Sequence, residues 1–464
     1  MLGVLVLLYL LVIVGIGVYF VRHVHGVEDF ALAGRNLGLP ILIGTLFATY
    51  IGGATVVGWT GSFYEMGFDW WWSGIGGLAG IALATLVMAR RSRRLGQFTV
   101  PDLLAIRYGA TARYVSAVMI ILGDIAIVTV QVIAIAGILT TFTDLGRLPA
   151  MVVGIVAFAV ISLFGGMKGV AVTDSLQALV IFVGLLAGVL VLFGTQGGLG
   201  PTFAGLPEGY LEPLSVTGPL GALGLAFAAL GTTAVSQALI FSRIFSARTE
   251  RVAFHGMLLL IPTAFLGYLL VSLLGYGGRS LLGPGVHADE VFARVVNELL
   301  PPAVGGLLLA TVIAAIVTST NSILLSASVN LARDIYRTTV RHEAGSAELR
   351  RVGQAAVVVF ALLAFGLAVA LPGIVDAIVL SYTIYSAGLL IPMYVGFLWR
   401  GATPAAGVAS IVAGGGTALL WFVLGEPADL PAILPALGVA LVVILGVSAV
   451  TPRPSRENLR VFTV

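Results

Sequence analysis

The chain has 464 residues, of which 59% are hydrophobic and only 10% are charged. A soluble domain carries about 25% charged residues, so this composition excludes a soluble enzyme and a disordered chain and indicates a polytopic membrane protein. The net charge of +3 is small, and because the chain has no cysteine, disulfides and thiolate metal sites are excluded.

The first predicted element is the apolar stretch 1–21, which precedes the first cation, Arg22. A cleaved signal peptide begins with a basic region, so this order predicts a retained helix that starts outside. A spanning helix needs about 20 apolar residues, and this measure predicts an all-α polytopic membrane protein with about thirteen transmembrane helices. The predicted ranges are 2–21, 39–63, 71–90, 113–143, 149–166, 174–194, 218–242, 252–276, 300–331, 352–371, 373–398, 404–424 and 431–450.

The positions of the cations support this topology. With the N-terminus outside, only Arg147, Arg279 and Arg294 of the 24 Lys and Arg fall on predicted outer segments. The positive-inside rule therefore predicts a multi-pass protein of the cell (inner) membrane with a cytoplasmic C-terminus, whose basic loops contact membrane lipids. No soluble segment interrupts the chain, so residues 1–464 are expected to form a single transmembrane domain. Neither a nucleic-acid partner nor an obligatory protein partner is indicated.

Small and polar residues interrupt the second predicted helix over residues 48–61, which include four glycines. Glycine weakens a helix, and the backbone carbonyls that it frees need a partner in hydrocarbon. An ion or a substrate can be that partner, and Thr55, Gly58 and Trp59 are the candidate substrate contacts. The alternative is close helix packing by small residues.

Asp124 is predicted to lie at mid-depth in the membrane, about 11 residues or roughly 16 Å inside its helix. A buried carboxylate is costly, so this residue is a candidate functional group. It could bind a cationic group of a substrate or carry a proton. The alternative is a structural acid that is protonated or hydrogen-bonded to Gln131 or to a neighbouring helix.

A run of polar residues from Thr318 to Ser322 lies inside the predicted helix 300–331. Thr318, Asn321 and Ser322 share one helix face by their spacing, and hydroxyl oxygens suit a hard cation such as sodium. The alternative is that each hydroxyl bonds to the backbone carbonyl one turn earlier.

The predicted helices 39–63 and 218–242 are both interrupted by glycine, and they are five helices apart. An odd offset makes the two units enter the membrane in opposite directions, and paired broken helices in inverted repeats indicate a binding site at the membrane midplane with alternating access. The sequence thus predicts two inverted five-helix repeats, 39–194 and 218–398. Helix 1–21 and two C-terminal helices in 404–450 lie outside the repeats.

Several short motifs occur in one order along the chain. They are Asp29–Arg35, the glycine-rich stretch 52–61, Pro101-Asp102, Arg107–Gly109, Gly165-Gly166, Thr173–Gln177, Arg243 with Ala247-Arg248, and Ala314–Tyr336. In this order and spacing, the sequence resembles the sodium:solute symporter family over roughly residues 28–400. The resemblance implies a LeuT-like core of two inverted repeats whose first helices are broken.

The resemblance also implies a sodium site between the first and the eighth core helices. Its ligands here would be the carbonyls of Ala48, Ile51 and Ala315 and the hydroxyls of Thr318 and Ser319. Asp174 would help the ion to leave toward the cytoplasm. The alternative for this residue is an N-cap that opens the next helix.

Within the family, Ile51–Gly53, Asp124 and Ser322–Ser328 are similar to the choline-type branch, which holds a quaternary ammonium with aromatic side chains. Cation–π attraction explains such a cage, to which Trp59 and Tyr64 could contribute. Amino acids and other small polar solutes are equally plausible substrates.

The resulting hypothesis is sodium-coupled symport of a small solute, with Na⁺ as the coupling ion and no other cofactor. One rival is a transporter coupled to protons through Asp124, and a rival of another class is a solute sensor or a channel. The five histidines lie in or beside predicted loops without metal-ligand spacing, so no enzyme is indicated.

Overall fold

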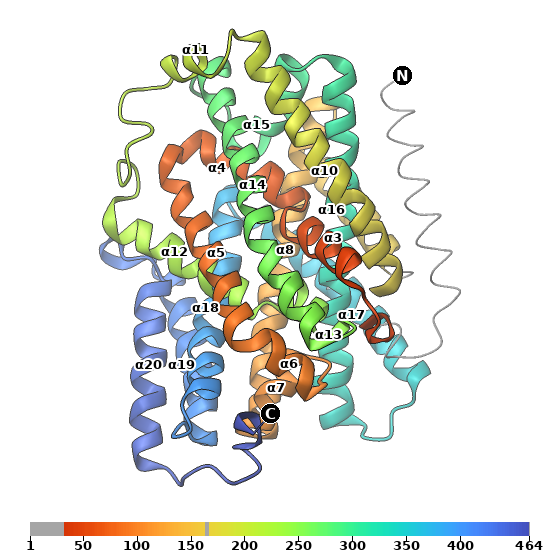
Figure 1. Cartoon of the computed structure of the whole chain (residues 1–464), viewed down its shortest axis with the longest axis vertical. Coiled ribbons are helices and arrows are strands. Elements are labelled where there is room, and N and C mark those ends of the chain that lie inside the picture. The colour runs from red at the N-terminus through yellow and green to blue at the C-terminus, as the bar shows by residue number, and fades with distance from the viewer. Residues whose placement is uncertain (1–31, 163–166, 464) are drawn as a thin grey trace.

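The computed structural model describes residues 32–162 and 167–463, and these residues form a bundle of helices, with a long connection between α11 (Leu199–Ala204) and α12 (Gly218–Val235) (Figure 1). The predicted first helix, 2–21, lies outside the described residues. The longer helices are α3 (Leu39–Tyr50), α4 (Gly53–Met66), α5 (Trp71–Leu83), α7 (Val100–Tyr108), α8 (Ala110–Phe142), α9 (Arg147–Ser162), α10 (Met167–Thr195), α12 (Gly218–Val235), α14 (Glu250–Leu282), α16 (Pro302–Val329), α17 (Ser346–Ala370), α18 (Ile374–Leu398), α19 (Pro404–Val423) and α20 (Ile433–Val450). The shorter ones used below are α6 (Arg90–Leu95), α11 (Leu199–Ala204), α13 (Ser242–Ser246), α15 (Ala288–Arg294), and the π-helices η4 (Gln237–Phe241) and η6 (Asn330–Val340).

Ten helices in the described part of the chain are long and apolar enough to cross a membrane. The all-α polytopic fold is therefore confirmed, whereas the count of thirteen spans stays a prediction. The predicted start of one span was wrong: α10 begins at Met167, so Asp174 lies inside this helix and is not its N-cap.

Helix starts follow local sequence signals. Thr99, Thr249 and Thr403 each precede a helix, and each side chain accepts a hydrogen bond from a backbone N–H in the first turn. Gly109 has a φ of +92° between α7 and α8, a conformation that glycine adopts without strain. Gly109 thus separates the short helix α7 from the long helix α8. The most apolar part of α8 is 89% buried, in the centre of the bundle.

The predicted helix 39–63, the first helix of the first predicted repeat, is broken. α3 ends at Tyr50, Ile51 and Gly52 leave the helical conformation, and α4 starts at Gly53. Gly52 is extended, with φ −75° and ψ 179°. No side chain caps the N-terminus of α4. The glycine-rich segment predicted from the sequence therefore does interrupt the helical hydrogen bonds of the backbone.

The second glycine-rich helix is broken as well. α12 ends at Val235, Ser236 is extended with φ −62° and ψ 120°, and the chain continues through η4 into α13. The hydroxyl of Ser236 accepts a hydrogen bond from the backbone N–H of Leu239, at 3.2 Å. Both breaks lie at the centre of the helix bundle, against α8, α14, α16 and α18.

Arginines are concentrated at one end of the bundle. α6, α7 and α13 gather near the C-terminus (Figure 1), and α6 carries Arg90, Arg91, Arg93 and Arg94. We call this the basic end. α11 and α15 lie at the opposite end.

At that opposite end, α15 packs against α4 and α8 through glycine. A methyl group at Gly61 of α4 would overlap the carbonyl of Ala288, and one at Gly137 of α8 would overlap the carbonyl of Asp289. The backbone of α15 therefore sits directly on both helices.

Candidate functional site

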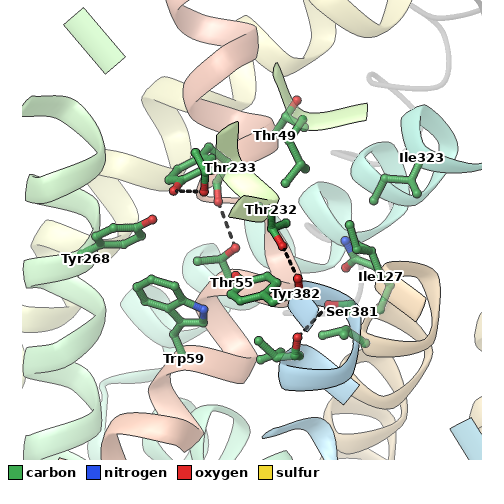
Figure 2. Close-up of a pocket in the computed structure, with 16 residues that line it drawn as sticks. Thr49, Thr55, Trp59, Ile127, Thr232, Thr233, Tyr268, Ile323, Ser381 and Tyr382 are labelled. Carbon is green, nitrogen blue, oxygen red and sulfur yellow. Dashed lines mark hydrogen bonds between the residues drawn. The ribbon is translucent and has the colours of Figure 1, made fainter. Parts of the chain in front are cut away.

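A cavity of about 50 Å³ lies between the two breaks. We call it the central cavity (Figure 2). Residues of both broken helices line it, together with residues of α8, α14, α16 and α18. The lining residues are Thr49, Tyr50, Gly52, Thr55, Trp59, Ile127, Val130, Gln131, Thr232, Thr233, Leu239, Tyr268, Ile323, Ile378, Ser381 and Tyr382.

Aromatic side chains form one side of the central cavity. The rings of Trp59 and Tyr268 are stacked with centroids 4.2 Å apart, and Tyr50 and Tyr382 complete this side. Among the described residues that line the cavity, none carries a charged side chain. The cavity therefore suits a solute whose charges are balanced or absent.

Hydroxyl groups connect the two breaks around the cavity. Tyr50 and Thr233 share a hydrogen bond of 3.0 Å between their hydroxyls, and Thr55 donates to the carbonyl of Tyr50 at 2.9 Å. Thr232 donates to the carbonyl of Tyr382 at 2.8 Å. These bonds hold α3, α4, α12 and α18 in register at the level of the cavity (Figure 2).

Two polar atoms of the lining have no partner in the protein. They are the indole nitrogen of Trp59 and the side-chain oxygen of Gln131. Both residues are nearly fully buried, with 2% and 3% of their surfaces exposed. Because an unpaired buried polar group is costly, these atoms mark one donor and one acceptor available to a ligand.

Beside the central cavity, α16 meets the first break. A Cβ on Gly52 would lie 2.7 Å from the hydroxyl oxygen of Ser319 and 3.1 Å from the carbonyl oxygen of Ala48. Two of the predicted sodium ligands thus converge on one point at the break. Ser319 and Ala315 are buried on α16, whereas the side chain of Thr318 is not among those that the structure describes.

Asp174 lies on α10, toward the basic end from this point. Its carboxylate accepts hydrogen bonds from Thr45 at 2.8 Å and Thr49 at 3.2 Å, both on α3. It also forms an ion pair of 3.3 Å with Arg243 of α13. Arg243 reaches Ser322 of α16 at 3.4 Å. One buried ion pair therefore joins α3, α10, α13 and α16.

Asp124 is fully buried on α8 and does not line the central cavity. It accepts a hydrogen bond from the hydroxyl of Tyr385 of α18, and Ser326 of α16 also faces it. Gln131, the partner considered from the sequence, lies in the cavity lining instead.

The structure gathers some of the predicted substrate contacts and separates others. Thr55 and Trp59 line the central cavity, whereas Gly58 packs against Ile378, with a virtual Cβ only 2.7 Å from its terminal methyl. Tyr268 and Tyr382 were not singled out from the sequence, because a single tyrosine in an apolar helix carries no motif. Arg243 was noted as a motif, but its pairing with Asp174 spans 69 positions in the chain.

The comparisons with known proteins give one family. Residues 30–414 match the sodium:solute symporter family. The osmoregulated proline transporter OpuE of Bacillus subtilis is 22% identical, with 98% of this chain and 96% of that protein aligned. The sodium/pantothenate symporter of Escherichia coli is 24% identical, with 88% and 87% aligned. The sodium/proline symporter of Salmonella typhimurium is 25% identical, with 94% and 92% aligned.

Solved structures share the fold. A Na⁺-coupled sialic acid symporter in a substrate-bound outward-open state superposes with a TM-score of 0.80, at 18% identity and with 98% of both chains covered. Mhp1, a nucleobase-cation-symport-1 family transporter, superposes with a TM-score of 0.58 at 14% identity, covering 94% of this chain and 99% of the other. The expected LeuT-like fold is confirmed.

Proposed function

Because the chain belongs to the sodium:solute symporter family, we propose that it uses the inward sodium gradient to import a small zwitterionic solute of the amino-acid class. The named relatives are transporters and symporters, so the protein is a sodium-coupled transporter and not an enzyme. Our proposal also covers the residues that bind sodium, the class of the solute and the orientation of the protein in the membrane.

The sodium ion is held at the first break. The proposed ligands are the carbonyls of Ala48, Ile51 and Ala315 and the hydroxyls of Thr318 and Ser319. The convergence of Ser319 and Ala48 on Gly52 is the observation that carries this proposal. Oxygen atoms suit sodium, and a bound ion would join α3 and α4 to α16, which belong to opposite predicted repeats.

The solute binds in the central cavity at the N-terminus of α4. A helix N-terminus without a side-chain cap attracts a carboxylate, and the unpaired indole N–H of Trp59 supplies a further donor. The unpaired oxygen of Gln131 and the faces of Tyr50 and Tyr382 suit an ammonium group. The proline transport of several relatives supports this class, and a choline-like solute stays the alternative.

The basic end faces the cytoplasm in this proposal. The cations of α6 and the basic loops beside it follow the positive-inside rule. The ion pair of Asp174 and Arg243 then lies between the sodium site and the cytoplasm. Release of sodium requires this pair to separate or to rotate, which gives Asp174 its proposed part in ion release.

Uptake of labelled proline into proteoliposomes tests the function. We expect uptake when sodium is high outside and little uptake when potassium replaces it, with glycine betaine and choline as competitors of the alternative class. Equal uptake in sodium and potassium would reject sodium coupling, and competition by choline but not by proline would reject the amino-acid class.

Substitution of the hydroxyl pair tests the ion site. Thr318→Ala with Ser319→Ala should weaken the sodium affinity by about tenfold or more, since each hydroxyl contributes a charge-assisted contact. Ser328→Ala is the matched control, because Ser328 is buried on the same helix and its hydroxyl bonds back to Leu325. An unchanged sodium affinity in the double variant contradicts the proposed site.

A further inference from the structure

Asp124 lies between the central cavity and a second, smaller cavity. On α8 it shares a helix face with Ile127 and Gln131, which line the central cavity one and two turns away. On α18, its partner Tyr385 lies one turn beyond Ser381 and Tyr382, which also line that cavity. The hydrogen-bonded pair therefore forms part of the partition on the basic-end side of the solute.

The second cavity lies on the other side of this partition, and we call it the inner cavity. Its volume is about 30 Å³, enough for about two water molecules. Its lining residues are Phe98, Gln237, Ser242, Ser322, Leu325, Ser326 and Val329. Ser326 both faces Asp124 and lines the inner cavity, so it connects the carboxyl group with that space.

The cost of a buried charge determines the protonation state of Asp124. One carboxyl oxygen accepts the hydrogen bond from Tyr385, and the hydroxyl of Ser326 also faces the carboxyl group, but neither neighbour is a cation. An unpaired buried carboxylate costs several kcal/mol, so Asp124 is either neutral or balanced by a cation.

A proton fits this site better than a metal ion. A metal cation requires a shell of oxygen ligands, and the two side chains that face Asp124, Tyr385 and Ser326, supply one hydroxyl oxygen each. A proton needs a single carboxyl oxygen, and Oδ2 is available for it.

The side chains that face Asp124 carry no charge, and the cation at the wall of the inner cavity, Arg243, is paired with Asp174. From α18 the phenol of Tyr385 faces it, and from α16 the hydroxyl of Ser326. Near this level, α17 meets α8 through Ala364, and α19 meets it through Gly415, neither of which can ionise. On α8 itself, the nearest cation toward the basic end is Arg113, about 16 Å away along the helix, where it pairs with Asp102.

We propose that Asp124 is a proton-binding site in the partition between the two cavities, and that import requires this proton in addition to the sodium ion. A hydronium ion that reaches the inner cavity from the basic end transfers its proton past Ser326 to Oδ2 of Asp124. An O–H bond forms on the carboxyl group and a water molecule remains. Release reverses the step. The neutral carboxyl lets the solute pass without meeting an unbalanced charge.

The pH dependence of uptake tests this site, on the basis of the proposed sodium-driven transport. With sodium and solute saturating, uptake by the wild type should fall as the pH on the basic-end side rises, approaching about tenfold per unit, the slope of one proton. Asp124→Asn, which mimics the protonated acid, should retain uptake with a flat pH profile. A wild-type pH profile in Asp124→Asn overturns the proposal, and so does a large rise in the KM for solute without loss of the pH response, which indicates a contact with a cationic solute.

Two further measurements keep the proposal testable. Asp144→Asn, an exposed acid just beyond α8, is the control and should keep the wild-type profile. Tyr385→Phe removes one hydrogen bond to the carboxylate and should shift the profile to higher pH by up to about one unit; an unshifted profile counts against the site.

A measurement without transport separates this proposal from the proposed function. Since a buried neutral Asp124 takes up a proton on folding, the Tm of the purified wild type should fall with rising pH more steeply than that of Asp124→Asn. Parallel Tm curves overturn the proton site even if sodium-driven uptake is confirmed. Diverging curves support it even if proline is not the solute.

Discussion

The two broken helices meet the same cavity but satisfy their backbones differently. At the first break, no side chain caps α4, and Gly52 lies against Ser319 of another helix. At the second, the hydroxyl of Ser236 caps η4 from within the same segment. An uncapped break leaves more of its backbone groups for a ligand than a capped break, in which a side chain already satisfies one of them. The difference supports our proposal that ligands bind mainly at the first break.

The second break contributes through Arg243, which lies just beyond η4 on α13. This arginine pairs with Asp174 and donates to Thr49 of α3 at 2.7 Å. The second broken helix thus anchors the first one on its basic-end side. Three substitutions can break or sharpen this division between a binding break and an anchoring break, and a fourth concerns α15, which lies on α4.

The largest effect is expected from the anchor. Arg243→Leu leaves the carboxylate of Asp174 buried without its cation, and this should lower the free energy of unfolding by about 3–5 kcal/mol. Thermal unfolding in detergent measures it. The double variant with Asp174→Asn should recover part of the loss; if the double variant is less stable than the single one, the pair is not the anchor.

Gly52→Ala tests the binding break. The added methyl group would lie 2.7 Å from the hydroxyl oxygen of Ser319 and 3.1 Å from the carbonyl oxygen of Ala48. The serine side chain can turn away, so we expect a moderate loss of stability but a sodium affinity weaker by about tenfold. Sodium-dependent uptake measures it. Gly416→Ala, where nothing lies within 4 Å, is the control, and equal sodium affinity in both variants would contradict the division.

Ser236→Ala tests the capped break. Loss of an N-cap should cost about 1 kcal/mol of stability and leave the sodium affinity unchanged. Thermal unfolding and sodium-dependent uptake measure the two quantities. A tenfold weaker sodium affinity in this variant would place the second break in the ion site.

The smallest effect concerns α15, which lies on α4. Burial raises the pKa of Asp289 above its ordinary value of 3.8, although Arg147 lies 3.1 Å from its carboxylate. The folded protein therefore binds this proton at a higher pH than the unfolded chain does, so its contribution to stability decreases as the pH rises from 3.8 through the raised value. Asp289→Asn should flatten this part of the Tm–pH curve slightly; a steeper curve would show the opposite sign.

The sequence predicted the fold and the first break because both depend on local composition. Long apolar segments require helices in lipid, and the pair Gly52-Gly53 within such a segment weakens the helix where it ends. The second break was predicted as a glycine interruption of helix 218–242, but the chain breaks at Ser236, beyond the glycines of that helix. Its position depends on the side-chain cap that Ser236 provides. In the sequence, Ser236 cannot be distinguished from many other serines in apolar segments.

The contacts between helices could not be predicted in the same way. Trp59 was a candidate by its place beside the break, but its stacking partner Tyr268 comes from α14, and no local pattern marks it. Asp124 was recognised by its depth, whereas its partner Tyr385 depends on how α8 and α18 cross. Pairings across the bundle are set by tertiary packing, and a single sequence does not contain their distances.

The seating of α15 has a consequence for any movement at the end of the bundle opposite the basic end. Its main chain touches Gly61 and Gly137 with no space for a methyl group, so a movement of α15 relative to α4 and α8 has to displace its backbone and not only its side chains. We expect such a movement to be a collective displacement on the microsecond-to-millisecond scale. Because the chain has no native cysteine, one disulfide engineered between α15 and α4 would be the only one in the protein. If import needs movement of α15, this disulfide should stop solute uptake, and its reduction should restore uptake.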